Sequence, residues 1–141
     1  MKPAPISTLA LAIAAILTSP TGPSSAAPYP DRSGICYYFP VGTDTPTLTQ
    51  PCVLSSGYGA GAHYTVLQWA DGVKTRILMI NTCPSATADD QGFCRYTVDD
   101  VEALPYDRDN FFQETSPPEP DNLPCYQVLE TGNSVCYRFS P

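Results

Sequence analysis

The chain has a single histidine, His63, and no other side chain has an unperturbed pKa so close to neutrality. Such a side chain is the first candidate for a general base. No carboxylate neighbours it in the sequence, and neither Ser55 nor Ser56 lies in the pattern of a nucleophile elbow. We therefore expect His63 to be a strand residue that faces solvent or is hydrogen-bonded, in a protein that is not an enzyme.

The densest group of carboxylates could in principle bind a cation or cleave a glycosidic bond. Calcium needs six to eight oxygen ligands around a turn that glycine permits, and no complete loop of that kind is present. Nothing in the sequence positions a catalytic pair either. We interpret the group as helix capping and solvated surface, without a metal; its members are Asp99, Asp100, Glu102, Asp107 and Asp109.

Glycines alternate with other residues at Gly57, Gly59 and Gly61, which superficially resembles a phosphate-binding loop. Such a loop needs a strand before it and a helix after it, whereas here a strand is expected to follow. We therefore expect no nucleotide or other cofactor and interpret residues 57–62 as a loose turn or bulge. The alternative is a loop that inserts into a partner, with the binding residues Ser56, Tyr58, His63 and Tyr64.

Six cysteines in a short chain are typical of three disulfides in an oxidising compartment. The sequence has no CxxC pair, and its one histidine is remote from the cysteines, so a zinc site is not expected. A bridge across residues 83–94 would close a loop of about 12 residues and stabilise the fold by roughly 3 kcal/mol. The six are Cys36, Cys52, Cys83, Cys94, Cys125 and Cys136.

The N-terminal segment has the pattern of a signal peptide. Lys2 precedes an apolar stretch over residues 8–18, and small residues at Ser25 and Ala27 predict cleavage after Ala27. The stretch is shorter than the roughly 20 residues that span a bilayer, so we expect no membrane anchor. The expected location is secreted or periplasmic.

The remaining chain suits one small domain. We expect residues 1–27 to be removed, residues 28–34 to form a mobile leader, and residues 35–141 to form a single β domain. The net charge of −7 disfavours nucleic acid and anionic lipid as partners, since neither would be neutralised. A monomer that contacts an extracytoplasmic protein is the expectation.

The clearest predicted element is a hairpin of residues 63–69 and 73–80 around Ala70-Asp71-Gly72. A three-residue loop sets Leu67 opposite Thr75 and Thr65 opposite Ile77, whereas a one-residue slip would mix charge into the apolar face. That face would hold Trp69, Leu67, Val73, Ile77 and Met79.

A second hairpin is predicted at the C-terminus, over residues 126–130 and 135–139. Pairing Glu130 with Val135 gathers the apolar side chains of Tyr126, Val128, Val135, Tyr137 and Phe139 on one face. Cys136 would then lie opposite Leu129, roughly 13 Å from Cys125, which is too far for a disulfide. Two patterns stay open: local pairs Cys36–Cys52 and Cys125–Cys136, or crossed pairs between the two ends of the domain.

Shorter elements complete the expected fold. Strands are predicted at residues 36–39, 48–55 and 93–98, with Pro51 indicating an edge strand. Residues 99–105 have the pattern of one helical turn, because Asp99 and Glu102 form a capping box. The fold class is all-β: a small, mostly antiparallel, disulfide-stabilised barrel or sandwich with one short helical turn.

Two resemblances follow from these motifs. The segments 52–64, 69–72 and 132–138 resemble small exported proteins of unassigned function from cyanobacteria. Gly61-Ala62-His63-Tyr64, followed by Trp69 and Gly72, is similar to the Ser-Gly-Ala-Arg-Tyr segment and Trp-x-x-Gly turn of periplasmic inhibitors of C-type lysozyme. That family implies a small disulfide-bearing antiparallel barrel whose segment enters the lysozyme cleft. Here His63 stands in place of the arginine and Ala60 in place of the serine.

We expect an exported, disulfide-stabilised, non-enzymatic binding or envelope-associated domain. The alternatives are an inhibitor of a lysozyme-like or other hydrolase, and a small secreted hydrolase. An inhibitor should display residues 56–64 as a protruding loop, and an enzyme should gather His63 with a carboxylate in a cleft. A binding module should expose a patch of tyrosines such as Tyr58 or Tyr64.

Overall fold

The computed structural model describes residues 27–84, 87–116 and 120–141, so the expected signal peptide lies outside them except for Ala27. The described part contains strands and turns, and no helix in it is long and apolar enough to cross a membrane. The strands are β1 (Ala27–Pro28), β2 (Arg32–Phe39), β3 (Leu48–Gly59), β4 (Ala62–Trp69), β5 (Lys74–Ile80), β6 (Arg95–Val98), β7 (Val101–Arg108), β8 (Glu114–Thr115), β9 (Leu123–Val128) and β10 (Ser134–Phe139).

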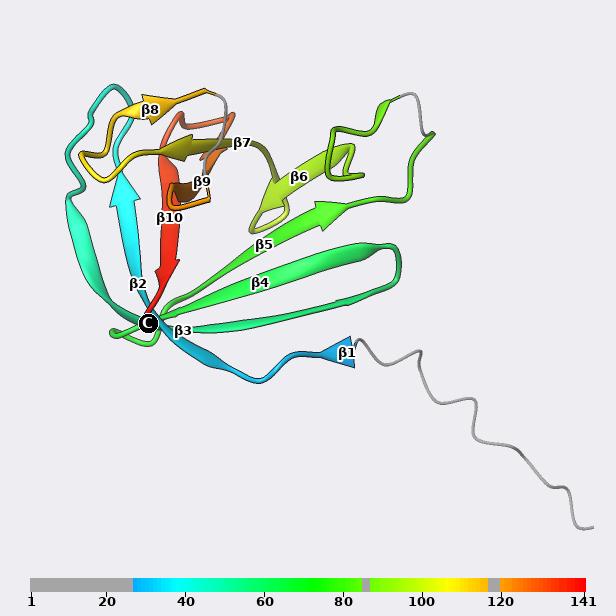
Figure 1. Ribbon diagram of the computed structural model, residues 1–141, viewed down its shortest axis with the longest axis horizontal. Helices are drawn as coiled ribbons and strands as arrows, with labels where there is room; N and C mark the ends of the chain where they lie inside the picture. The colour runs from blue at the N-terminus through cyan, green and yellow to red at the C-terminus, as the bar shows by residue number, and fades with distance from the viewer. Residues whose placement is uncertain (1–26, 85–86, 117–119) are drawn as a thin grey trace, which may run out of the picture.

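Eight strands follow one another around a closed antiparallel barrel, in the order β2, β3, β4, β5, β6, β7, β9, β10 (Figure 1). The barrel closes where β10 pairs with β2, so it has no open sheet edge there. The short β8 pairs with β7. The prediction of an all-β, disulfide-stabilised antiparallel barrel is confirmed.

The segment expected to be a leader contributes to two strands. Pro28 in β1 lies opposite Gly57 of β3, and the backbone N–H of Tyr29 donates to the carbonyl of Ser56 at 2.8 Å. Strand β2 begins at Arg32, inside that segment, and pairs with β3 from there on. The first residues of the described chain thus cover the edge of β3 that β2 leaves unpaired.

The β4–β5 hairpin has the predicted register. Leu67 lies opposite Thr75 and Thr65 opposite Ile77, around a loop in which Gly72 has a φ of 88°. The Trp69 backbone N–H donates to the carbonyl of Val73 at 2.8 Å. The assignment of Val73 to the apolar face is wrong: it is 57% exposed, because it lies beyond the last paired residues.

The predicted helical turn at residues 99–105 is wrong. Asp99 and Asp100 have φ values of 48° and 66° and form the two-residue turn between β6 and β7. Two consecutive left-handed residues match the twist of a hairpin, and Asp tolerates that conformation better than most residues. The Asp99 carboxylate also accepts a hydrogen bond of 2.8 Å from the Arg76 backbone N–H, so it fixes a turn rather than capping a helix.

Residues 57–62 are not the loose turn or bulge that we predicted, because most of them belong to strands. Strand β3 runs on to Gly59, and only Ala60 and Gly61 form the turn, with φ values of 50° and 75°. A side chain at position 61 would place a Cβ 1.9 Å from Cγ2 of Thr82, so glycine is required for close packing as well as for backbone conformation.

We predicted an edge strand around Pro51. The strand is not at an edge of the sheet, but Pro51 itself has a neighbouring strand on one side only. Strand β3 lies between β2 and β4. Its pairing with β4 begins at Cys52, opposite Trp69, while Pro51 pairs only with Ile35 of β2. Pro51 therefore lies in the part of β3 that has one neighbour, where a missing backbone donor is tolerated.

The predicted register of the C-terminal hairpin is wrong. Cys136 lies opposite Cys125, not Leu129, and residues 129–132 form the loop, with Gly132 at a φ of 76°. Each residue of β10 lies opposite a β9 residue four positions earlier than predicted. Because an even shift keeps every side chain on its face, Tyr126 and Val135 still face the same side.

The correct register brings the cysteines of this hairpin within disulfide distance, so the disfavoured local pairing is the one observed. Cα–Cα distances are 4.2 Å for Cys125–Cys136, 5.9 Å for Cys36–Cys52 and 6.2 Å for Cys83–Cys94. Crossed pairing is wrong, and the predicted Cys83–Cys94 bridge is confirmed.

Two apolar clusters hold the fold together. The barrel interior centres on Leu54, Leu67 and Ile77, and Trp69 donates from Nε1 to Oγ1 of Thr75 at 3.0 Å. The second cluster, called the outer cluster below, lies on the other face of the sheet; it comprises Tyr37, Phe39, Leu123, Cys125 and Cys136, with Tyr106 and Phe112 against them. Leu123, at the start of β9, is fully buried there.

Candidate functional site

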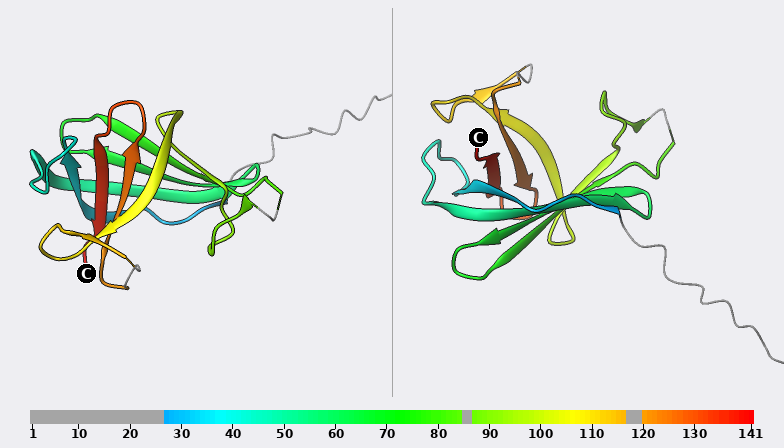
Figure 2. Two further views of the ribbon diagram at one scale, coloured as in Figure 1. Left: turned by 90° about the horizontal axis from the view of Figure 1, so that it is seen from above. Right: turned by 60° about the horizontal axis from the view of Figure 1, so that its bottom comes forward.

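The barrel wall has an opening where the short strand β6 begins. Tyr96, Thr97 and Val98 of β6 pair with Val101–Ala103. Residues 104–106 of β7 then have no partner on that edge, before Asp107 and Arg108 pair with β8. Pro105 lies on this free stretch and has no backbone N–H to offer a neighbouring strand. Strands β3–β5 extend past the shorter β2, β9 and β10 at the same end (Figure 2).

A cavity of about 790 Å³, here called the mouth pocket, occupies this opening. Its walls come from the loop before β6, from the free stretch of β7, from residues 114–116 and from the aromatic residues of three strands. This volume is in the range of pockets that hold small organic molecules. The side chains used below are Met79, Asp89, Tyr96, Asp107, Tyr126 and Tyr137.

Three buried tyrosines form the aromatic wall of the mouth pocket. The ring centroids of Tyr96 and Tyr126 are 6.1 Å apart, and those of Tyr126 and Tyr137 are 6.4 Å apart with nearly parallel planes. The Tyr126 hydroxyl donates to the sulfur of Met79 at 3.6 Å, and a thioether is a weak acceptor. Burial, together with Tyr137, raises the pKa of Tyr126 well above its ordinary value, so its hydroxyl stays protonated.

The carboxylates at the mouth pocket differ in their partners. Asp89 accepts hydrogen bonds from the Tyr96 hydroxyl and from the backbone N–H of Phe93. Burial alone would raise the pKa of Asp89, but these hydrogen bonds outweigh it and lower the pKa below its ordinary value. For Asp107, burial is unopposed and raises the pKa.

The predicted binding residues lie next to this pocket on the β3–β4 hairpin. Ser56, Tyr58 and His63 share the face that carries Leu54 and Leu67 further down, whereas Tyr64 lies on the opposite face. Tyr58 lies opposite His63 and is 47% exposed.

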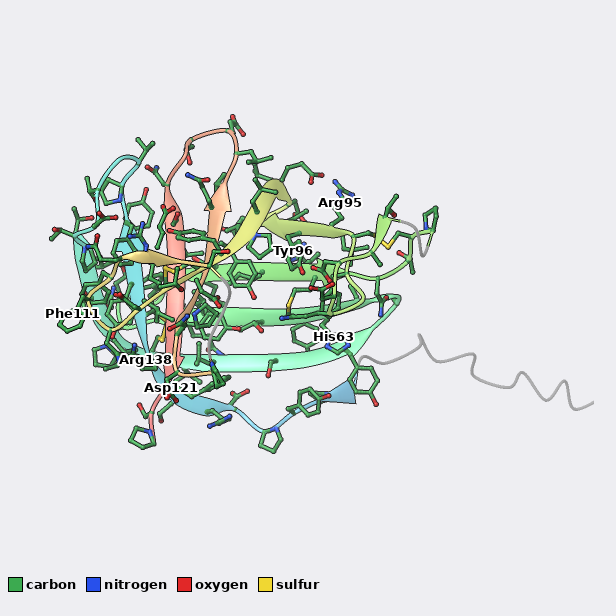
Figure 3. The ribbon with its side chains drawn as sticks, turned by 45° about the horizontal axis from the view of Figure 1, so that its top comes forward. His63, Arg95, Tyr96, Phe111, Asp121 and Arg138 are labelled. Atoms are coloured by element: carbon green, nitrogen blue, oxygen red, sulfur yellow. A yellow bond between two sulfur atoms is a disulfide. The ribbon has the colours of Figure 1, made fainter. Side chains whose placement is uncertain are left out.

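An unbroken row of aromatic rings links His63 to the mouth pocket. The ring of His63 contacts Phe93 edge-to-face at 5.2 Å, and Phe93 contacts Tyr96 at 6.1 Å. In Figure 3, His63 and Tyr96 lie on the same side of the molecule, remote from Phe111. Within the described part of the chain, His63 forms no hydrogen bond with a carboxylate.

The acidic group of the sequence is dispersed by the fold. Asp100 pairs with Arg76 at 2.5 Å, Glu102 pairs with Arg95, and Asp109 accepts backbone hydrogen bonds within its own turn. Only Asp107 reaches the mouth pocket. No group of three or more His, Cys, Asp or Glu side chains suited to a metal occurs among the described residues.

A smaller hollow of about 390 Å³ lies at the opposite end of the barrel. It is lined mainly by apolar side chains at the turns, including Trp69, Val98 and Val135. It also contains two aromatic side chains and two carboxylates, but those of Asp71 and Asp99 each accept a hydrogen bond from a backbone N–H.

The sequence contained a partial signal for the mouth pocket. Tyr126 and Tyr137 are predicted on one apolar face, but nothing local relates them to Tyr96 or Asp107, which come from other strands. Comparison with family models, with curated proteins and with solved structures finds no match for this chain.

Proposed function

We propose that this protein is an exported, non-enzymatic binding domain that takes a small organic molecule into the mouth pocket. The observation that carries this proposal is the cavity of about 790 Å³ with buried tyrosines in its wall, at a gap in an otherwise closed barrel. Ligand sites of this kind are concave, mostly apolar and placed at barrel mouths.

Export is supported by the cysteines. All six are joined in three disulfides, which is consistent with an oxidising extracytoplasmic compartment. Because none is free, none can serve as a thiolate nucleophile. The bridge Cys83–Cys94 closes the loop that supplies Asp89 to the mouth pocket, so it also restricts the shape of the pocket.

The test is a set of NMR titrations with benzyl alcohol, benzylamine and benzoate, which share a ring and differ in charge. At least one should shift the signals of Tyr96, Tyr126 and Tyr137 together. Replacing exposed Gln91 of the pocket wall by tryptophan should block binding, whereas Thr47→Trp, at the other end of the barrel, should not. If none of the three probes shifts these tyrosines, the proposal is wrong.

Inhibition of a lysozyme-like hydrolase is the second candidate function. The feature in its favour is the β3–β4 hairpin, which extends past β2 and ends in the tight turn at Ala60 and Gly61. A rigid projecting hairpin suits insertion into an enzyme cleft, because little conformational freedom is lost on binding.

The second candidate is tested by adding the purified protein to a C-type lysozyme assay. Inhibition that is lost in Tyr58→Ala and His63→Ala, but kept in Tyr64→Ala, would support insertion of the inner hairpin face. Full lysozyme activity at every protein concentration would exclude this function.

A further inference from the structure

We propose that the ligand of the mouth pocket is a small organic cation, with an ammonium group held between the Asp107 carboxylate and the tyrosine rings. This inference rests on the proposed function and adds the chemical class of the ligand. It comes from the charges and surfaces that meet in the pocket.

The charge in the mouth pocket has one sign. The described residues that line it include four carboxylates and no lysine, arginine or histidine. The protein as a whole carries a net charge of −7, which would attract cations toward the opening. An anionic ligand would meet repulsion here, and a neutral one would leave these carboxylates unused.

Two of the four carboxylates already have partners within the protein. Asp89 is bonded to the Tyr96 hydroxyl and to backbone N–H groups, and Glu114 lies 3.9 Å from Nη2 of Arg108. Asp90 is exposed at the rim. Asp107 is half-buried and, in the described part of the chain, has neither an ion pair nor a side-chain hydrogen bond. Of the two carboxylates without such a partner, Asp107 is the less exposed.

The neighbouring arginine does not serve as a counter-ion for Asp107. Arg108 follows Asp107 in β7, so its side chain points to the other face of the sheet, where it pairs with Asp44 at 2.8 Å. Arg95 precedes Tyr96 in β6, so its side chain likewise points to the other face of the sheet, where it pairs with Glu102. A cationic group of a ligand would supply the counter-ion that Asp107 does not have among the described residues.

The aromatic wall fits the same ligand. Tyr96, Tyr126 and Tyr137 line the pocket, and the faces of such rings attract ammonium groups, most strongly where water is excluded. Pro105 of β7 lies opposite Tyr126 of β9, and Asp107, two residues further along β7, is on the same face, so the charge and the rings line one region of the pocket.

The test compares choline with 3,3-dimethylbutan-1-ol, which has the same shape without the charge, and adds benzylamine and spermidine. At least one cation should bind and shift the tyrosine signals, and choline should bind at least about tenfold more tightly than its neutral isostere. Asp107→Asn should weaken cation binding at least about tenfold, while Asp121→Asn, an exposed carboxylate outside the pocket, should not.

The outcomes separate the two proposals. Binding of benzyl alcohol without binding of any cation would overturn the cation inference and leave the proposed function standing. Equal affinity for choline and its isostere, or cation binding unaffected by Asp107→Asn, would also overturn it. Silence of all probes would overturn both. A dispersed NMR spectrum of Asp107→Asn establishes that any loss of binding comes from the site and not from unfolding.

Discussion

The guanidinium of Arg108 donates a hydrogen bond of 2.6 Å to the carbonyl of Phe112, four residues further along the chain. The Arg108 side chain is only 4% exposed and lies over the Phe39 ring at 4.3 Å. The ring of Phe112 packs against Tyr37 and Phe39 at 5.4 and 5.6 Å. One buried cation therefore fastens the β7–β8 turn to the outer cluster.

Replacing Arg108 by glutamine should destabilise the protein by about 2–3 kcal/mol. The change removes hydrogen bonds to Asp44 and Phe112 and the contact with the Phe39 ring. Urea unfolding measures the difference. Arg138→Gln is the matched control, because Arg138 makes an exposed hydrogen bond to Asn110; a comparable loss there would contradict the special role of Arg108.

At position 112, a glycine variant should be more stable than an alanine variant, which is the reverse of the usual order. The Phe112 φ of 63° is left-handed, a conformation that costs a non-glycine residue about 1 kcal/mol. Both Phe112→Ala and Phe112→Gly lose the ring, but only glycine also relieves the backbone. Chemical denaturation should find the glycine variant more stable than the alanine variant by about 1 kcal/mol. A more stable alanine variant would argue against this turn geometry.

Asp89 should make stability depend on acid pH. Its folded-state pKa lies below the ordinary value of 3.8, so its contribution is complete above that pH and is lost as pH falls through the lower, folded-state pKa. Asp89→Asn should cost about 1 kcal/mol at neutral pH and flatten the acid limb of a melting-temperature profile. An unchanged acid limb would mean that the Asp89–Tyr96 hydrogen bond does not contribute.

Asp107 should make the stability of the protein depend on pH in the opposite direction. Burial raises its folded-state pKa, so the contribution of this group to stability falls as pH rises from the ordinary value of 3.8 through the raised pKa. Without a bound cation, Asp107→Asn should therefore be more stable than the parent at neutral pH and lose that advantage in acid. Thermal melts at several pH values measure this; lower stability at neutral pH would contradict it.

Removing the Cys125–Cys136 bridge should cost about 3 kcal/mol, because it closes a short loop in the unfolded chain. The double variant Cys125→Ala, Cys136→Ala should keep its register, since Tyr126 still lies opposite Val135 in the interior. Denaturation measures the loss, and contacts between Tyr126 and Val135 in NMR spectra report the register. Contacts between Glu130 and Val135 instead would show that the disulfide sets the register.

The two hairpins show how far local patterns reach. Around Gly72 the loop length and the alternation of apolar residues admit one register, and that prediction is confirmed. At the C-terminus a shift of four residues leaves every side chain on the same face, so the pattern could not distinguish the registers. The pairing of β10 with β2 and of β9 with β7 is what fixes it.

Turns were ambiguous for a different reason. Asp99 and Glu102 satisfy a capping box, yet the same residues form a left-handed turn and a strand position once β6 and β7 pair. The candidate site was harder still. Tyr96, Asp107 and Tyr126 come from three strands, and no spacing in the sequence relates one to another.

By itself, the sequence determined that this chain is an antiparallel β protein held by disulfides, because strand alternation, turn residues and cysteine count are local properties. Only the tertiary structure decided that the strands close into a barrel, that Cys125 meets Cys136, and that the wall opens beyond Ala103. These features depend on pairing between residues far apart in the chain. Their register is set by the burial of side chains and the closure of the barrel, which involve all the strands together.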